Sequence, residues 1–194
     1  MITRYRSVVS ADHVEAALRT IWQDLMRRGM LPDEVDNYRR SSEWFPWLKT
    51  HPAIEQLRES LNHRFGRGLF CSLPQIVFQP PDTYAAELHP HVDRDQQGET
   101  FASIAGLALT AQTQRSGGLV WWDHDGNIRA APPAEPGDVL VMDGETPHAS
   151  GPNKSAMPRI AVYFREEGHS STDSIANRPQ AEPRSPMSWS AHRL

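Results

Sequence analysis

Apolar residues recur at three- and four-residue intervals in the first third of the chain and in short alternating runs afterwards. The first pattern predicts two helices. One begins after Ser10 as its N-cap and ends near Gly29, and the other opens at Pro52 and ends at Gly66. The apolar faces of these helices carry Val14, Ala17, Leu18, Ile21, Trp22 and Leu25 in the first, and Ile54, Leu57 and Leu61 in the second.

From Leu69 onward, short β-rich runs alternate with turn residues. Asp125-Gly126 is typical of a hairpin, and Pro136-Gly137-Asp138 indicates a second tight turn. Many short strands in series predict a mainly β fold with flanking helices. We expect a double-stranded β-helix, a jelly-roll barrel of the cupin type, with the N-terminal helices packed outside it. The expected strands cover 76–78, 87–92, 101–109, 118–122, 139–142 and 160–164.

This pattern predicts one domain followed by a tail. Residues 1–165 are expected to form a single jelly-roll domain, with a helical part over 1–68 and a β core over 69–165. Residues 166–194 are rich in Ser, Pro and charged side chains, and their apolar residues are too sparse to build a core. We therefore expect a flexible C-terminal tail.

Composition narrows the class of protein only a little. A chain of 194 residues is long enough for one well-buried core. The net charge of -4 gives no strong field for nucleic acid or a membrane surface. Cys71 is the single cysteine, which is typical of a reducing compartment, and neither a signal core nor a membrane-length apolar run is present. These features predict a cytoplasmic protein with no nucleic-acid or membrane partner.

His91 and Asp93 carry the strongest chemical signal in the chain. Two residues apart on a strand, they point to the same face because side chains alternate. His148 follows the apolar run 139–142 and a turn, and would bring a second histidine from a distant strand. Two histidines and one carboxylate form the facial triad of non-haem Fe(II) oxygenases, which leaves coordination positions open. We therefore expect a metal site built from these three residues.

Arg159 adds a second signal, because it opens the last predicted strand on the same face as Ala161 and Tyr163. An arginine inside a barrel is costly unless an anion pairs with it. Its planar guanidinium is suited to hold a carboxylate with two hydrogen bonds. The distal carboxylate of 2-oxoglutarate would be such a partner, while the keto acid end chelates the metal. Arg165, on the same face, is a weaker alternative for this role.

Two other interpretations remain open at this point. His89 shares a face with His91, and the pair matches the His-x-His of a cupin, with Glu99 near the place of the cupin glutamate. Together with His148, this set predicts an isomerase or a dioxygenase that does not use 2-oxoglutarate. The other interpretation is a non-catalytic barrel that binds a small ligand.

Several segments, in order and spacing, resemble the phytanoyl-CoA hydroxylase-like family of Fe(II)/2-oxoglutarate-dependent dioxygenases over roughly residues 70–165. In that family the two histidines and the aspartate bind iron, and the arginine binds the far carboxylate of 2-oxoglutarate. The serine two places after the second histidine often assists, which implies a role for Ser150. The segments that carry the resemblance are His91-x-Asp93, Ser116-Gly117-Gly118-Leu119, Pro136-Gly137-Asp138-Val139, His148-x-Ser150 and Arg159.

The resemblance also implies an activity. Fe(II) would be the cofactor, and 2-oxoglutarate and dioxygen the co-substrates. The expected reaction hydroxylates an unactivated C–H bond of a small metabolite, an amino acid or a natural-product intermediate, and releases succinate and CO2. Related halogenases lack the carboxylate ligand, so the presence of Asp93 favours hydroxylation or another oxidation. Further candidates for contacts to 2-oxoglutarate are Gln75, Gln79 and Tyr84.

Four side chains are candidates for contacts to the substrate. Trp121 and Trp122 follow the Gly-Gly segment, and one of the two should face the barrel interior. Arg94 and Arg115 could bind a polar substrate group. The identity of the substrate and the oligomeric state cannot be read from the sequence.

Overall fold

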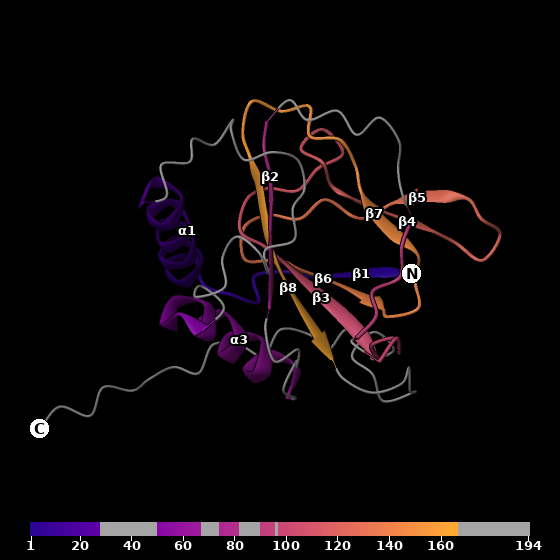
Figure 1. Cartoon of the computed structure of the whole chain (residues 1–194), viewed down its shortest axis with the longest axis horizontal. Helices are drawn as coiled ribbons and strands as arrows, with labels where there is room; N and C mark the ends of the chain where they lie inside the picture. The colour runs from indigo at the N-terminus through magenta and orange to yellow at the C-terminus, as the bar shows by residue number, and fades with distance from the viewer. Residues whose placement is uncertain (28–49, 67–73, 82–89, 96, 167–194) are drawn as a thin grey trace, which may run out of the picture.

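Two antiparallel sheets and two helices make up the described part of the chain, residues 1–27, 50–66, 74–81, 90–95 and 97–166 of a computed structural model (Figure 1). The larger sheet has the order β1-β6-β3-β8-β2, and the smaller one β5-β4-β7. Along the chain the elements are β1 (Ile2–Tyr5), α1 (Ala11–Arg27), α3 (Pro52–Phe65), β2 (Gln75–Gln79), β3 (Ser103–Ala108), β4 (Leu119–Trp122), β5 (Ile128–Ala130), β6 (Val139–Asp143), β7 (His148–Ser150) and β8 (Arg159–Glu166).

Both helices begin at capping residues. The Ser10 hydroxyl accepts a hydrogen bond from the backbone N–H of His13 at 3.3 Å, which confirms the predicted N-cap of α1. The ring of His51 caps α3, and Pro52 occupies the first turn. Gly66 ends α3 in the left-handed conformation, with φ of 66°, as predicted.

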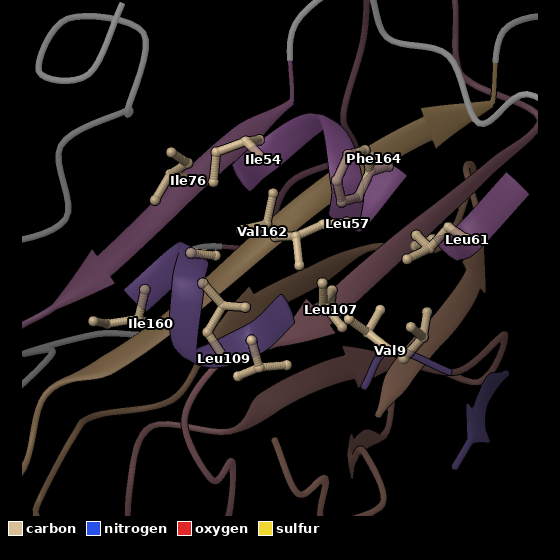
Figure 2. Close-up of a cluster of buried hydrophobic side chains, with 14 of the residues drawn as sticks. Val9, Ile54, Leu57, Leu61, Ile76, Leu107, Leu109, Ile160, Val162 and Phe164 are labelled. Atoms are coloured by element: carbon tan, nitrogen blue, oxygen red, sulfur yellow. The ribbon is translucent and has the colours of Figure 1, made fainter. Parts of the chain in front are cut away.

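The two helices cover one face of the larger sheet (Figure 1). Their predicted apolar faces are buried there: Ile21, Ile54 and Leu57 are fully inaccessible. Figure 2 shows how side chains from α3 and from the strands meet in this cluster. Burial of apolar surface between helix and sheet is the main source of stability for such a layer.

Strand β8 contributes to two different cores. Ile160, Val162 and Phe164 lie in the helix-side cluster (Figure 2), whereas Ala161 and Tyr163 lie in a second cluster on the opposite face. The alternation predicted for this strand is therefore confirmed. The second cluster contains Leu119 of β4 together with residues of the larger sheet, so it fills the space between the two sheets, as expected for a jelly roll: Ile104, Leu140, Met142 and Val77.

The predicted turns are present. Strands β4 and β5 form a hairpin around Asp125-Gly126, closed by a hydrogen bond from Gly126 N–H to the carbonyl of Asp123 at 2.9 Å. At the other turn, the N–H of Asp138 donates to the carbonyl of Glu135 at 2.9 Å. The hairpin and turn dipeptides therefore predicted these connections correctly.

The structure differs from the sequence-based picture at the N-terminus. The helical part predicted over 1–68 begins with a strand that the sequence analysis did not predict. This strand, β1, pairs with β6 from Ile2 opposite Met142 to Tyr5 opposite Val139. Asp138 holds this strand through an ion pair with Arg4 and a hydrogen bond from the N–H of Ser7. Such a four-residue strand depends on partners far away in sequence, which local periodicity does not report.

At the other end of the fold, β8 runs to Glu166, whose carboxylate accepts a 2.7 Å hydrogen bond from the buried Ser103 hydroxyl. Of the predicted tail, residues 167–194 lie outside the described residues, and so do residues 87–89 of the predicted strand 87–92. Residues 90–92 are described, and there the predicted strand is reduced to an isolated β-bridge at His91. Within the described part of the chain, neither helix is long and apolar enough to cross a membrane.

Candidate metal centre

His91 and His148 come from distant segments that a pair of backbone hydrogen bonds joins. The N–H of His91 donates to the carbonyl of His148 at 3.0 Å, and the reverse bond is 2.9 Å. Residues that exchange both bonds in an antiparallel pair lie directly opposite each other, so their side chains leave on the same face. Their rings lie 4.6 Å apart between centroids.

Asp93, two residues after His91, completes this arrangement. The candidate ligand atoms of His91, Asp93 and His148 all lie within 4.8 Å of one another, and the Nε2 atom of His91 is 3.7 Å from the Oδ1 atom of Asp93. Adjacent ligands of an octahedral ion with bonds of about 2.1 Å stand about 3 Å apart, so modest side-chain rotations would close the site on a metal. Two imidazoles and a carboxylate suit Fe(II) and leave coordination positions for other ligands.

A backbone carbonyl orients His148. Its Nδ1 atom lies 2.9 Å from the carbonyl oxygen of Thr146, and since that oxygen only accepts, Nδ1 carries the proton. The Nε2 lone pair is thus kept for a metal, the arrangement that metal-binding histidines generally show. Burial lowers the pKa of His148 below its ordinary value of 6.5, despite the opposing effects of the Thr146 carbonyl and of Asp93. The ring is therefore in its neutral, ligating form near neutral pH.

Arg165 holds the carboxylate of Asp93. Its Nε and Nη2 atoms donate to Oδ2 of Asp93 at 2.9 and 2.7 Å, and Nη2 also donates to the side-chain oxygen of Gln75. Burial acts to raise the pKa of Asp93, but the charge and hydrogen bonds of Arg165, together with the two nearby histidines, hold it below its ordinary value of 3.8. Asp93 is thus ionised and ready to bind a cation.

Arg159 is buried among neutral groups. Its side chain is fully inaccessible, and its hydrogen-bond acceptors are the hydroxyl of Ser150 at 2.9 Å, the hydroxyl of Tyr163 at 2.7 Å and the amide oxygen of Gln79 at 3.3 Å. Within the described residues it forms no ion pair, and its Nε atom has no hydrogen-bond partner. A buried cation with this surrounding calls for an anionic ligand.

Glycines make room for two of these partners. A Cβ atom at Gly106, opposite Tyr163 in the sheet, would lie 2.8 Å from Cε1 of the tyrosine ring. A Cβ atom at Gly117, where φ is 79°, would collide with the side-chain oxygen of Gln79. Both glycines therefore allow the close approach of groups that bind Arg159.

The candidate substrate tryptophans lie beside this centre. Trp121 stands opposite His148 in the β4–β7 pair and packs against the inter-sheet cluster, so it is the inward-facing member of the two. Trp121 and Trp122 line a hollow of about 600 Å³ that also includes Thr146. None of the three candidate ligands belongs to its lining, so the hollow adjoins the centre through Thr146 rather than containing it.

The remaining predicted site residues are either exposed or outside the described part of the chain. Arg94 is exposed and donates to the carbonyl of Gly98 in its own turn, and Arg115 is exposed in the turn before β4. Glu99 is exposed and is not part of the ligand group found among the described residues. Tyr84 and His89 lie outside the described residues.

Sequence reasoning missed two contributors. Thr146 acts through its backbone carbonyl, which no side-chain pattern reports. Arg165 is an alternative partner for the 2-oxoglutarate carboxylate in the sequence analysis, but in the structure it pairs with Asp93. Likewise Gln75, a candidate contact to 2-oxoglutarate, binds Arg165. The alternation of β8 contained a signal for Arg165, since it shares the inner face with Arg159.

The profile of the family described as phytanoyl-CoA dioxygenase (PhyH) matches residues 6–161. No curated protein matches the chain in sequence.

Solved structures are similar in fold at low sequence identity. The non-haem α-ketoglutarate-dependent carbocyclase SnoK of nogalamycin biosynthesis is 20% identical, with 94% of this chain and 88% of that chain covered and a TM-score of 0.55. EvdO2 from Micromonospora carbonacea var. aurantiaca in complex with 2-oxoglutarate is 18% identical, with coverage of 91% and 90% and a TM-score of 0.54. EctD from S. alaskensis with 2-oxoglutarate and 5-hydroxyectoine is 17% identical, with coverage of 84% and 71% and a TM-score of 0.58.

Proposed function

The chain belongs to the phytanoyl-CoA dioxygenase family, and from this premise we propose that it hydroxylates an unactivated C–H bond of a small metabolite. Enzymes of this group use Fe(II) as cofactor and 2-oxoglutarate and dioxygen as co-substrates. The overall reaction converts R–H, 2-oxoglutarate and O2 into R–OH, succinate and CO2. The proposed substrate class is an amino acid or a natural-product intermediate.

One observation carries the proposal: a fully buried arginine, which forms no ion pair with the residues that the structure describes, lies near a two-histidine, one-carboxylate group. The triad alone would fit several metalloproteins. Arg159 adds the requirement for an anion. Its hydrogen-bond partner Ser150 lies two residues after His148 on β7, which brings the arginine close to the candidate ligands. A dicarboxylate that chelates a metal at one end and meets a guanidinium at the other satisfies both requirements.

Each residue has a defined part in this scheme. His91, Asp93 and His148 would hold Fe(II), which supplies the activation of dioxygen when it is bound. Thr146 keeps the proton of His148 on Nδ1. Ser150, Gln79 and Tyr163 orient Arg159 toward the distal carboxylate. Trp121 and Trp122 are the proposed substrate contacts, and Trp121 stands opposite His148 in the β4–β7 pair.

Hydroxylation is the specific part of the proposal. Similar folds serve a carbocyclase and an epimerase as well as a prolyl-4-hydroxylase from Pseudomonas putida, so the fold does not select the outcome. The carboxylate ligand Asp93 supports oxidation over halogenation, because it occupies the position that a halide would need.

The first test is succinate formation by the purified chain. We expect succinate only when Fe(II), 2-oxoglutarate and O2 are all present, and loss of this activity in H148A. A matched control is H63A, which removes an exposed histidine from the last turn of α3. Absence of succinate under every condition, together with no calorimetric signal for 2-oxoglutarate, would contradict the oxygenase function.

The second test separates hydroxylation from other outcomes. Metabolite mixtures are incubated with the enzyme under 18O2, and products are identified by mass spectrometry. Hydroxylation places one labelled oxygen atom in the product and the other in succinate. A product that forms with succinate but without label would contradict hydroxylation and leave the oxygenase assignment intact.

A further inference from the structure

Arg165 is held in place by three different parts of the fold. Besides its two bonds to Asp93, it donates to Gln75 on β2, and its guanidinium carbon lies 5.5 Å from the centroid of the Phe101 ring. Its side chain is only 12% exposed. A buried guanidinium with this many contacts has little freedom to move, so it fixes whatever group it binds.

The two oxygens of Asp93 consequently have different surroundings. Oδ2 accepts both N–H groups of Arg165, at 2.9 and 2.7 Å, so one edge of the guanidinium is directed at this oxygen. Oδ1 is the atom 3.7 Å from the Nε2 atom of His91. The hydrogen bonds therefore leave Oδ1 as the oxygen available to a cation shared with the histidines.

The two inward-facing arginines of β8 differ in how their charge is balanced. Arg159 meets only neutral acceptors among the described residues, whereas Arg165 pairs with a carboxylate. Strand β2 supplies a glutamine to each of them: Gln79 to Arg159 and Gln75 to Arg165. Arg159 thus keeps its charge for an incoming anion, and the charge of Arg165 is neutralised within the protein.

We propose that Arg165 is a positioning residue for the metal centre, acting through Asp93. It occupies Oδ2 and turns Oδ1 toward His91 and His148, so that the carboxylate binds the metal through one oxygen. A single-oxygen ligand leaves more coordination positions open than a carboxylate that binds through both oxygens. This inference rests on the proposed function, since it takes the triad as the Fe(II) site.

The direction of the effect on metal affinity separates positioning from simple charge. If Arg165 were only a nearby cation, its removal would reduce repulsion and tighten the binding of a divalent metal. If it positions Asp93, its removal frees the carboxylate to rotate, and the metal binds more weakly. Loss of such an outer hydrogen-bond partner typically weakens metal binding about 10- to 100-fold.

The experiment is a titration of the full chain with Mn(II), followed by the electron paramagnetic resonance signal of the free ion. We expect R165M to bind roughly 10- to 100-fold more weakly than the wild type. R165K should be intermediate, because an ammonium keeps the charge but lacks the fork that serves Asp93 and Gln75 together. R129M is the matched control: Arg129 also pairs with an aspartate, Asp123, but on the β4–β5 hairpin, and its loss should leave Mn(II) binding unchanged.

A double-variant cycle tests whether Arg165 acts through Asp93. In a D93N background the R165M substitution should weaken Mn(II) binding no further, whereas additive losses would indicate an independent effect and overturn the proposal. Wild-type-like or tighter Mn(II) binding by a folded R165M or R165K protein would also overturn it. Failure of the wild type itself to bind Mn(II) would instead contradict the metal centre, and with it the proposed function.

Discussion

Replacement of Arg159 by methionine should weaken the binding of 2-oxoglutarate by orders of magnitude and affect the fold much less. The side chain is fully buried, and its described partners are the neutral groups of Ser150, Gln79 and Tyr163. The charge of Arg159 is therefore balanced only when an anionic ligand arrives. Methionine has a comparable length and no charge, so it removes this attraction while it continues to fill the interior.

The magnitude follows from the burial of the pair. Removal of one partner of a buried ion pair costs about 3–5 kcal/mol, because the remaining charge is left without compensation. Each 1.4 kcal/mol corresponds to about a factor of ten in affinity, so R159M should bind 2-oxoglutarate roughly 100- to 4,000-fold more weakly. R159K keeps the charge but cannot form two parallel hydrogen bonds, so its affinity for 2-oxoglutarate should fall less than that of R159M.

Calorimetry on the Mn(II)-loaded protein measures this directly, and thermal unfolding provides an independent check. At a ligand concentration of about 100 times the wild-type Kd, 2-oxoglutarate should stabilise the wild type by about 2.7 kcal/mol and R159M by almost nothing. R129M, which removes an exposed arginine, should behave like the wild type. If R159M bound 2-oxoglutarate within threefold of the wild-type affinity, Arg159 would not be the partner of the distal carboxylate.

Three further outcomes are expected. Because burial lowers the pKa of His148 below 6.5, the unfolded chain takes up a proton there before the metal-free folded protein does. The free energy of unfolding should therefore fall with decreasing pH below about 6.5, by up to about 1.4 kcal/mol per pH unit, and urea titrations of H148Q should lack this component. G106A should lower the free energy of unfolding in urea by about 1–3 kcal/mol and weaken 2-oxoglutarate binding, because the new methyl group displaces the Tyr163 ring. An equal decrease in a Y163A background would contradict this reason. L57A should cost about 2–5 kcal/mol in the same assay, since Leu57 is fully buried, without changing 2-oxoglutarate affinity of the folded fraction.

The features that could be predicted from the sequence are those that depend on local rules. The two-residue spacing predicted that the side chains of His91 and Asp93 lie close together, although only His91 takes part in a β-bridge. Alternation along β8 separated Arg159 from Ile160. Capping chemistry located the start of α1 at Ser10 and the end of α3 at Gly66. Each of these inferences needs only a few neighbouring residues, and the structure has the same arrangement.

The features that could not be predicted depend on partners distant in sequence. Strand β1 forms because it pairs with β6 and because Arg4 forms an ion pair with Asp138. The four residues of the strand do not by themselves indicate this pairing. The roles of Arg159 and Arg165 differ although both share one face of one strand, because β2 and the segment carrying Asp93 decide which acceptors each arginine meets. Such distinctions require the packed tertiary structure.

The alternation of β8 also determines where the chain can tolerate insertions. One residue added within β8 would invert every side chain after it, which would bring Arg165 to the helix-covered face and Phe164 to the metal centre. Such a change would remove the core and the site together. The exposed β4–β5 turn around Asp125 carries no such constraint, since its residues pack against neither cluster. Lineages that acquire new length, and engineers who add a tag or a binding loop, should therefore find room at that hairpin and none in β8.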